Sequence, residues 1–183
     1  MKGELFAQGV NFAAIANQFL LAAMTLNEAQ KDQGKALFLP TLALAGHGLE
    51  MMLKACFFLN NKAPVTKGKK GHDIVSMWHD NICEPIRGHV FVNAHRVVAD
   101  LRDDARGYVF GIPKDEEILT LIDKYVIELG SLHGGAGYPL RYPTETDRQA
   151  PKTPFLVMTL YGVADDMVKR PHDFEVSRFQ GRT

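Results

Sequence analysis

Three polar residues recur at helical spacing inside an otherwise apolar stretch between residues 40 and 61. His47, Glu50 and Lys54 share one stripe of a helix, because positions three, four and seven apart lie on the same face. Glu50 and Lys54 can pair there across one turn. We favour an exposed ion pair, worth about a few tenths of a kcal/mol. The alternative is a polar seam that faces a partner helix or a pocket inside the fold, since the flanking residues are strongly apolar.

A histidine–aspartate dipeptide occurs twice, as His72-Asp73 and as His79-Asp80. The two histidines are two helical turns apart, about 10 Å along the axis, and a single zinc ion with bonds of about 2 Å could not join them. The chain also lacks HExxH and paired ExxH motifs. We therefore expect no metal site, and we assign both pairs to helix capping and surface hydrogen bonds, with Asp73 at the start of a short helix.

Other common catalytic and cofactor signatures are missing from the sequence. Its three serines lie outside any GxSxG elbow, and neither Gly34-Lys35 nor Gly68-Lys69 has the Walker spacing. The glycines at 134–137 follow a predicted helix, whereas a dinucleotide-binding fold requires a strand before them. The sequence therefore predicts no cofactor.

A loop rich in glycine and proline follows the helix that ends near His133. A protonated histidine is favourable at a helix C-terminus, and a nearby arginine such as Arg141 can hold a phosphate with two hydrogen bonds. His133 and Arg141 could thus form an anion or phosphodiester site beside Tyr142. The alternative, which we prefer from the residues alone, is that His133 caps the helix carbonyls while Tyr142 and Pro143 pack the loop down.

The elements that would position these residues are all helices. Apolar residues recur with helical period in six segments, and we find no alternating segment of useful length for a strand. The predicted helices span residues 11–30, 40–61, 72–80, 85–108, 113–133 and 154–169. The sequence therefore predicts an all-α bundle of five or six helices, with short loops early and one long loop late, at about residues 134–153.

Length and charge point to one ordinary domain. The chain has 183 residues, with 21 basic and 21 acidic side chains, so any binding to nucleic acid would have to be local. Its two cysteines, Cys56 and Cys83, have no ligand-like spacing, and polar residues interrupt the apolar N-terminal stretch. We expect a cytoplasmic protein without a signal peptide or membrane anchor, with one domain over residues 1–170 and a polar tail over 171–183.

Three short segments resemble the HEPN superfamily of small helical bundles. They are the apolar helix carrying residues 50–54 (EMMLK), the helix start at 71–74 (GHDI) after a basic linker, and residues 140–143 (LRYP). Members are typically dimers from toxin–antitoxin, abortive-infection and RNA-processing systems, and active members are metal-independent ribonucleases. The resemblance implies a homodimer, with an RNA or antitoxin-like protein as partner and no membrane.

The catalytic motif of that superfamily is an arginine followed four to six residues later by a histidine. His133 could match the histidine, but the arginine position falls on Val126, Ile127 or Glu128. A glutamate there would repel the charge that develops on a phosphate during cleavage. Arg141 could replace the arginine from the loop side.

These observations leave three functional hypotheses open. The first is a non-catalytic or catalytically degenerate HEPN-like protein that binds a protein or RNA partner. The second is a metal-independent endoribonuclease of a toxin–antitoxin or phage-defence system, and the third is a purely structural or regulatory bundle. The candidate catalytic residues are His133 and Arg141, and the candidate binding residues are Tyr142, His47, Glu50, Lys54 and His72.

Overall fold

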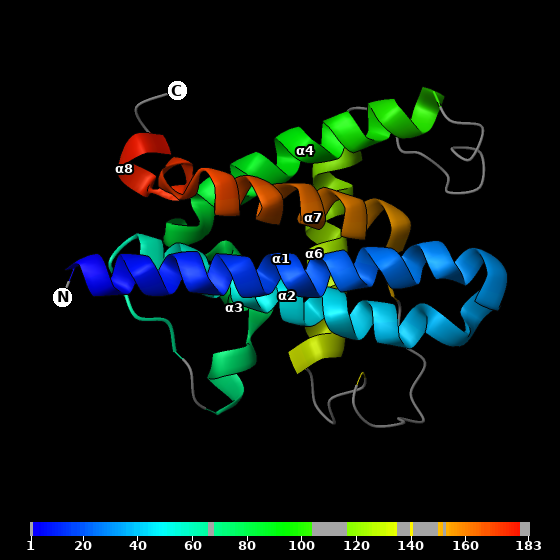
Figure 1. The fold of residues 1–183 in the computed structure, drawn as a ribbon, viewed down its shortest axis with the longest axis horizontal. Coiled ribbons are helices and arrows are strands. Elements are labelled where there is room, and N and C mark those ends of the chain that lie inside the picture. The colour runs from blue at the N-terminus through cyan, green and yellow to red at the C-terminus, as the bar shows by residue number, and fades with distance from the viewer. Residues whose placement is uncertain are drawn as a thin grey trace.

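The computed structural model describes residues 2–65, 68–103, 117–134, 140, 150–151 and 153–179 (Figure 1). This part of the chain is all-α, as the sequence predicts. Its α-helices are α1 (Lys2–Gln33), α2 (Phe38–Leu59), α3 (Ile74–His79), α4 (Glu84–Asp103), α6 (Ile118–Gly134), α7 (Thr153–Lys169) and α8 (Val176–Phe179). Four 3-10 turns occur between them, at Gly34–Leu37, Lys69–His72, Asn81–Cys83 and Pro171–Phe174.

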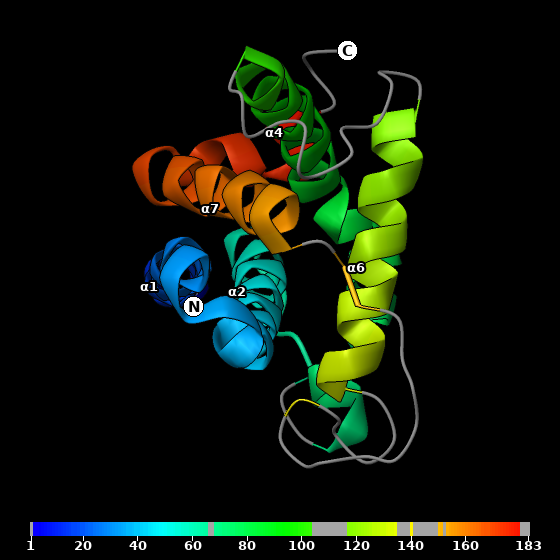
Figure 2. The same cartoon turned by 90° about the vertical axis from the view of Figure 1, so that its right-hand side faces the viewer.

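Helices α1 and α2 form an antiparallel hairpin that the turn at Gly34–Leu37 closes (Figure 1). Helix α7 packs along α1 and also contacts α4 and α2. Helix α6 runs steeply across the direction of α1 and α2, on the side of α2 away from α1, where it also packs against α3 (Figure 2). Helix α2 therefore lies at the centre of the bundle, with contacts to α1, α3, α6 and α7.

The first helix is longer than the sequence pattern predicts. It begins at Lys2 rather than near residue 11. The added turns contribute to packing, because Phe6 and Val10 lie against the core. Gly9 is so close to α2 that a Cβ at this position would lie 2.8 Å from Leu59. The apolar stripe of α1 thus extends to its first turns.

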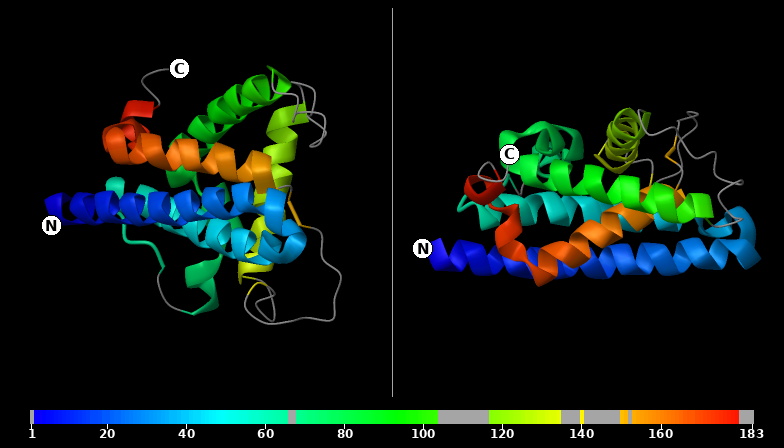
Figure 3. Two further views of the ribbon diagram at one scale, coloured as in Figure 1. Left: turned by 45° about the vertical axis from the view of Figure 1, so that its right-hand side comes forward. Right: turned by 90° about the horizontal axis from the view of Figure 1, so that it is seen from above.

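The C-terminal segment folds back onto the bundle (Figure 3). Residues 171–179, expected from the sequence to belong to a polar tail, form a 3-10 turn and α8, and Phe174 is fully buried. Asn60 at the end of α2 donates to the Phe174 carbonyl at 3.0 Å and accepts from the Val176 amide at 2.8 Å. The Phe174 ring also stacks on His89 of α4, with ring centroids 4.3 Å apart.

Two helices of the described chain are long and apolar enough to cross a membrane, by length and composition alone. The segment Phe38–Leu59 is 72% buried inside the bundle, as expected of a core helix, whereas Gly3–Gln30 is 28% buried. Signal sequences and core helices pass the same test, so this finding does not assign a location to the protein.

Candidate functional site

A carboxylate lies buried at the centre of the bundle, on α2. Glu50 is 1% exposed and Lys54 is 4% exposed. The prediction that they form an exposed ion pair is therefore wrong. The two do pair, with Lys54 Nζ 2.5 Å from Glu50 Oε1. Burial follows from the position of α2, which other helices cover on several sides. The alternative, a polar seam directed into the fold, is the arrangement that the structure has.

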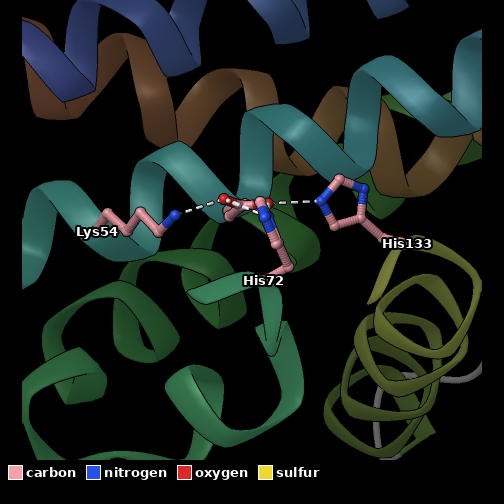
Figure 4. Close-up of polar contacts among 4 residues, drawn as sticks. Lys54, His72 and His133 are labelled. Atoms are coloured by element: carbon pink, nitrogen blue, oxygen red, sulfur yellow. Dashed lines mark hydrogen bonds and ion pairs between the residues drawn. The ribbon is translucent and has the colours of Figure 1, made fainter. Parts of the chain in front are cut away.

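Two histidines distant in sequence complete the surroundings of this carboxylate. His133 Nε2 lies 2.6 Å from Glu50 Oε2, and His72 Nδ1 lies 3.1 Å from Oε2 and 3.2 Å from Oε1 (Figure 4). Both carboxylate oxygens therefore accept hydrogen bonds. We refer to Glu50, Lys54, His72 and His133 as the Glu50 cluster.

Close backbone approach brings the histidines to Glu50. His133 occupies the last turn of α6, and a Cβ at Gly46 would lie 2.7 Å from its Nδ1. A Cβ at Gly134 would lie 2.5 Å from the His72 carbonyl oxygen. Glycine at these two positions therefore allows α6 to reach both α2 and the turn that carries His72.

A third histidine, His47, lies one turn before Glu50 on α2. Its ring stacks on Phe19 of α1, with centroids 5.5 Å apart, and meets the His133 ring edge-on at 4.6 Å. The potential ligand atoms of His47, Glu50 and His133 all lie within 4.8 Å of one another. This grouping combines two imidazoles and a carboxylate from two helices.

The electrostatics of the cluster favour an ionised Glu50. Burial by itself raises the pKa of this carboxyl group, but hydrogen bonds from His133, Lys54 and His72 and the charge of Lys54 outweigh it. The net effect lowers the pKa from 4.5 to about 2. Glu50 therefore remains a carboxylate at neutral pH and can orient the imidazoles that donate to it.

Access to the cluster is greatest at His72. Its side chain is 32% exposed, whereas those of Glu50 and His133 are 2% exposed. His72 thus contacts the buried carboxylate and solvent together. A carboxylate that fixes one ring nitrogen of a histidine leaves the other for hydrogen bonding or proton transfer, which is the usual arrangement in acid–base and anion-binding sites.

The other residues singled out from the sequence have different roles in the structure. Asp73 and Asp80 are helix caps, accepting from the amides of Ser76 and Ile82 at 3.0 Å and 2.9 Å. His79 is exposed, but assigning His72 to capping and surface hydrogen bonding is wrong, because it joins the Glu50 cluster. His133 is directed at Glu50 inside the fold. Arg141 and Tyr142 lie outside the described residues, as does most of the long loop that carries them.

Sequence reasoning missed the convergence of His72 and His133 on Glu50. The stripe of His47, Glu50 and Lys54 was visible from helical spacing, but His133 is 83 residues away from Glu50. A buried carboxylate in an apolar helix requires donors from elsewhere, and this requirement could have indicated distant partners had Glu50 been predicted to be buried.

Comparison with known proteins adds no assignment. Searches against protein families, curated proteins and solved structures found no match to this chain.

Proposed function

We propose that this chain is a HEPN-like helical bundle that binds RNA at the Glu50 cluster and lacks the usual arginine–histidine catalytic motif. The observation that carries the proposal is the contact between the partly exposed His72 and the buried Glu50. On this proposal the protein is a cytoplasmic homodimer, and light scattering should give twice the 20.4 kDa chain mass.

The energetic cost of the cluster supports a functional role. Burying a carboxylate and an ammonium group costs several kcal/mol per ion, and apolar side chains of similar volume are often as stabilising or more so. Glu50 and Lys54 nevertheless occupy the central helix, 1% and 4% exposed. Ionisable groups kept at such a cost are concentrated at ligand sites.

The composition of the segment that precedes His72 favours RNA over a protein partner. His72 follows a segment, residues 62–71, that contains four lysines and no acidic residue. Lysine and protonated histidine donate charge-assisted hydrogen bonds to phosphate oxygens. A local group of such donors can bind a nucleic-acid backbone even though the formal net charge of the chain is zero.

The test is the affinity of the full chain for fluorescently labelled single-stranded RNA, measured by anisotropy in EDTA. The variant His72→Ala should bind about tenfold more weakly, which corresponds to one lost charge-assisted hydrogen bond. The matched control is His79→Ala, because His79 also precedes an aspartate cap but is exposed and outside the cluster. Equal affinity of wild type and His72→Ala, or no RNA binding by the wild type, would reject the proposal.

A second candidate, metal-independent RNA cleavage, is favoured by one observation. Glu50 contacts His72 and His133 together, and a histidine oriented by a carboxylate is suited to general acid–base catalysis. Incubating RNA with wild type, His133→Ala and Arg141→Ala in EDTA tests it. Cleavage by wild type that both substitutions abolish would establish a ribonuclease in which Arg141 replaces the missing motif arginine. Intact RNA with folded wild type leaves the binding proposal in place.

A further inference from the structure

The bundle interior holds a set of ligand-type atoms that neither proposed activity uses in full. His47 and Glu50 lie three residues apart on α2, and His133 faces them from the end of α6. Their potential ligand atoms lie within 4.8 Å of one another, and His133 Nε2 is 2.6 Å from Glu50 Oε2. Each residue is held by a helix rather than by a loop.

The two oxygens of Glu50 are in different surroundings. Oε1 accepts from Lys54 at 2.5 Å and Oε2 faces His133 at 2.6 Å, while His72 Nδ1 lies 3.1–3.2 Å from both. A carboxylate that binds a metal through one oxygen is commonly hydrogen-bonded through the other, and such partners fix its orientation. Lys54 and His72 can therefore hold Glu50 through Oε1 while a cation replaces the His133 hydrogen bond at Oε2.

We infer that His47, Glu50 and His133 form a binding site for a divalent transition-metal ion such as Zn²⁺. Two imidazoles and one carboxylate are a ligand set that zinc and related ions use, with the remaining position left to water or substrate. Mg²⁺ prefers oxygen ligands and should not bind.

The present geometry is close to what such an ion requires. Zinc bonds to nitrogen and oxygen are about 2.0–2.2 Å long, so ligand atoms in a tetrahedral site lie roughly 3.3 Å apart. His133 Nε2 and Glu50 Oε2, at 2.6 Å, must separate by less than about 1 Å, and His47 must turn towards them. The ion takes the place of the proton between His133 Nε2 and Glu50 Oε2. As that proton leaves to solvent, Nδ1 takes one up, so the imidazole coordinates as its neutral Nδ1–H tautomer. His72, 3.1 Å from Oε2 and partly exposed, adjoins the site on its accessible side.

The spacing of these three ligands differs from that of the known zinc motifs. Zinc motifs such as HExxH place two ligands close in sequence in a recognised order. Here the order on α2 is histidine then glutamate, at 47 and 50, and the third ligand comes from residue 133. Only the crossing of α6 over α2 brings them together.

The experiment uses the full chain without an affinity tag, stripped with chelator and dialysed. Calorimetric titration with Zn²⁺ should give one ion per chain, and Mg²⁺ should give none. Co²⁺ as a spectroscopic substitute should produce the visible absorption of a low-symmetry nitrogen and oxygen site. The variants His47→Ala and His133→Gln should each lower Zn²⁺ affinity at least about 100-fold, since loss of outer-shell partners alone costs up to that much. His95→Ala, which removes an exposed histidine of α4, is the matched control and should bind as wild type does.

Each outcome decides the inference. Absence of Zn²⁺ binding by wild type would overturn it. The same Zn²⁺ affinity for wild type, His47→Ala and His95→Ala would also overturn it. If His133→Gln fails to fold by circular dichroism, His47→Ala and the wild-type Co²⁺ spectrum decide, because His47 is only partly buried and lies outside the hydrogen-bonded Glu50 cluster. RNA is absent from these titrations, so this result is independent of the RNA-binding proposal.

Discussion

Glu50 is the residue on which the candidate site depends, and its ionisation should be visible in the stability of the fold. Its pKa of about 2 in the folded chain lies below the ordinary value of 4.5. The carboxylate therefore adds stability above pH 4.5, and this stability is lost as the pH falls towards 2. The shift corresponds to at most about 3 kcal/mol.

The variant Glu50→Gln tests this linkage. The free energy of unfolding, measured with urea between pH 7 and pH 2, should fall less steeply for Glu50→Gln than for wild type over the interval from 4.5 to about 2. The control is Glu128→Gln, whose ion pair with the exposed Lys124 spans 3.7 Å and should contribute little. Parallel curves for wild type and Glu50→Gln would contradict the ionised state assigned to Glu50.

Residue spacing predicted part of this site. The shared face of His47, Glu50 and Lys54 and the pairing of Glu50 with Lys54 followed from helix geometry, and the structure confirms both. Burial did not follow, because a polar stripe on one helix does not reveal which neighbours cover it. His133 was singled out for its helix-end position, but its contact with Glu50 depends on how two helices cross.

At the scale of elements, the crossing of α2 and α6 depends on Gly46. A Cβ at this position would lie 2.7 Å from His133 Nδ1, so Gly46→Ala should displace the imidazole and lower the free energy of unfolding by about 1–3 kcal/mol. Gly3→Ala in α1 is the control, since a Cβ there meets nothing within 4 Å. Alanine is the better helix former by about 1 kcal/mol, so that variant should be neutral or more stable. Equal free energies of unfolding for Gly46→Ala and Gly3→Ala, measured by urea denaturation, would contradict the close approach of Gly46 to His133.

The helices themselves were largely predictable, because a period of 3.6 residues in apolar side chains is a local signal. The central helix was expected at residues 40–61 and spans Phe38–Leu59, and the fifth was expected to end near His133 and ends at Gly134. The sequence did not predict that α1 begins at Lys2. Gly3 and Gly9 are poor helix formers, and the residues around them do not form a continuous apolar stretch. Tertiary packing against α2 outweighs that local preference.

At the scale of the whole molecule, the C-terminal segment closes the bundle. Phe174 is fully buried, so Phe174→Ala should lower the free energy of unfolding by about 3–5 kcal/mol. Ser177→Ala, three residues on and exposed, should change it by less than about 0.5 kcal/mol. A cost for Phe174→Ala below about 1 kcal/mol, again by urea denaturation, would mean that the segment is not docked in solution.

That docking was beyond sequence reasoning because two aromatic residues five positions apart in a polar stretch, Phe174 and Phe179, do not establish a helical period. The all-α bundle as a whole was predicted correctly, since its evidence is repeated along the chain. Contacts that join distant segments, such as Asn60 with residues 174 and 176, have no such repetition. For the same reason the fold could be predicted from the sequence, whereas the contacts of His72 and His133 with Glu50 could not.

The central claim is that Glu50 holds His72 for RNA binding, and Glu50→Gln tests it most directly. Glu50 is 1% exposed, so an effect of this substitution on RNA affinity must act through the residues that it holds. Anisotropy titrations of labelled RNA at neutral pH, at a temperature where circular dichroism shows both proteins folded, should give about tenfold weaker binding for Glu50→Gln. Identical affinities for wild type and Glu50→Gln would contradict the claim and leave the cluster as a structural feature of the bundle.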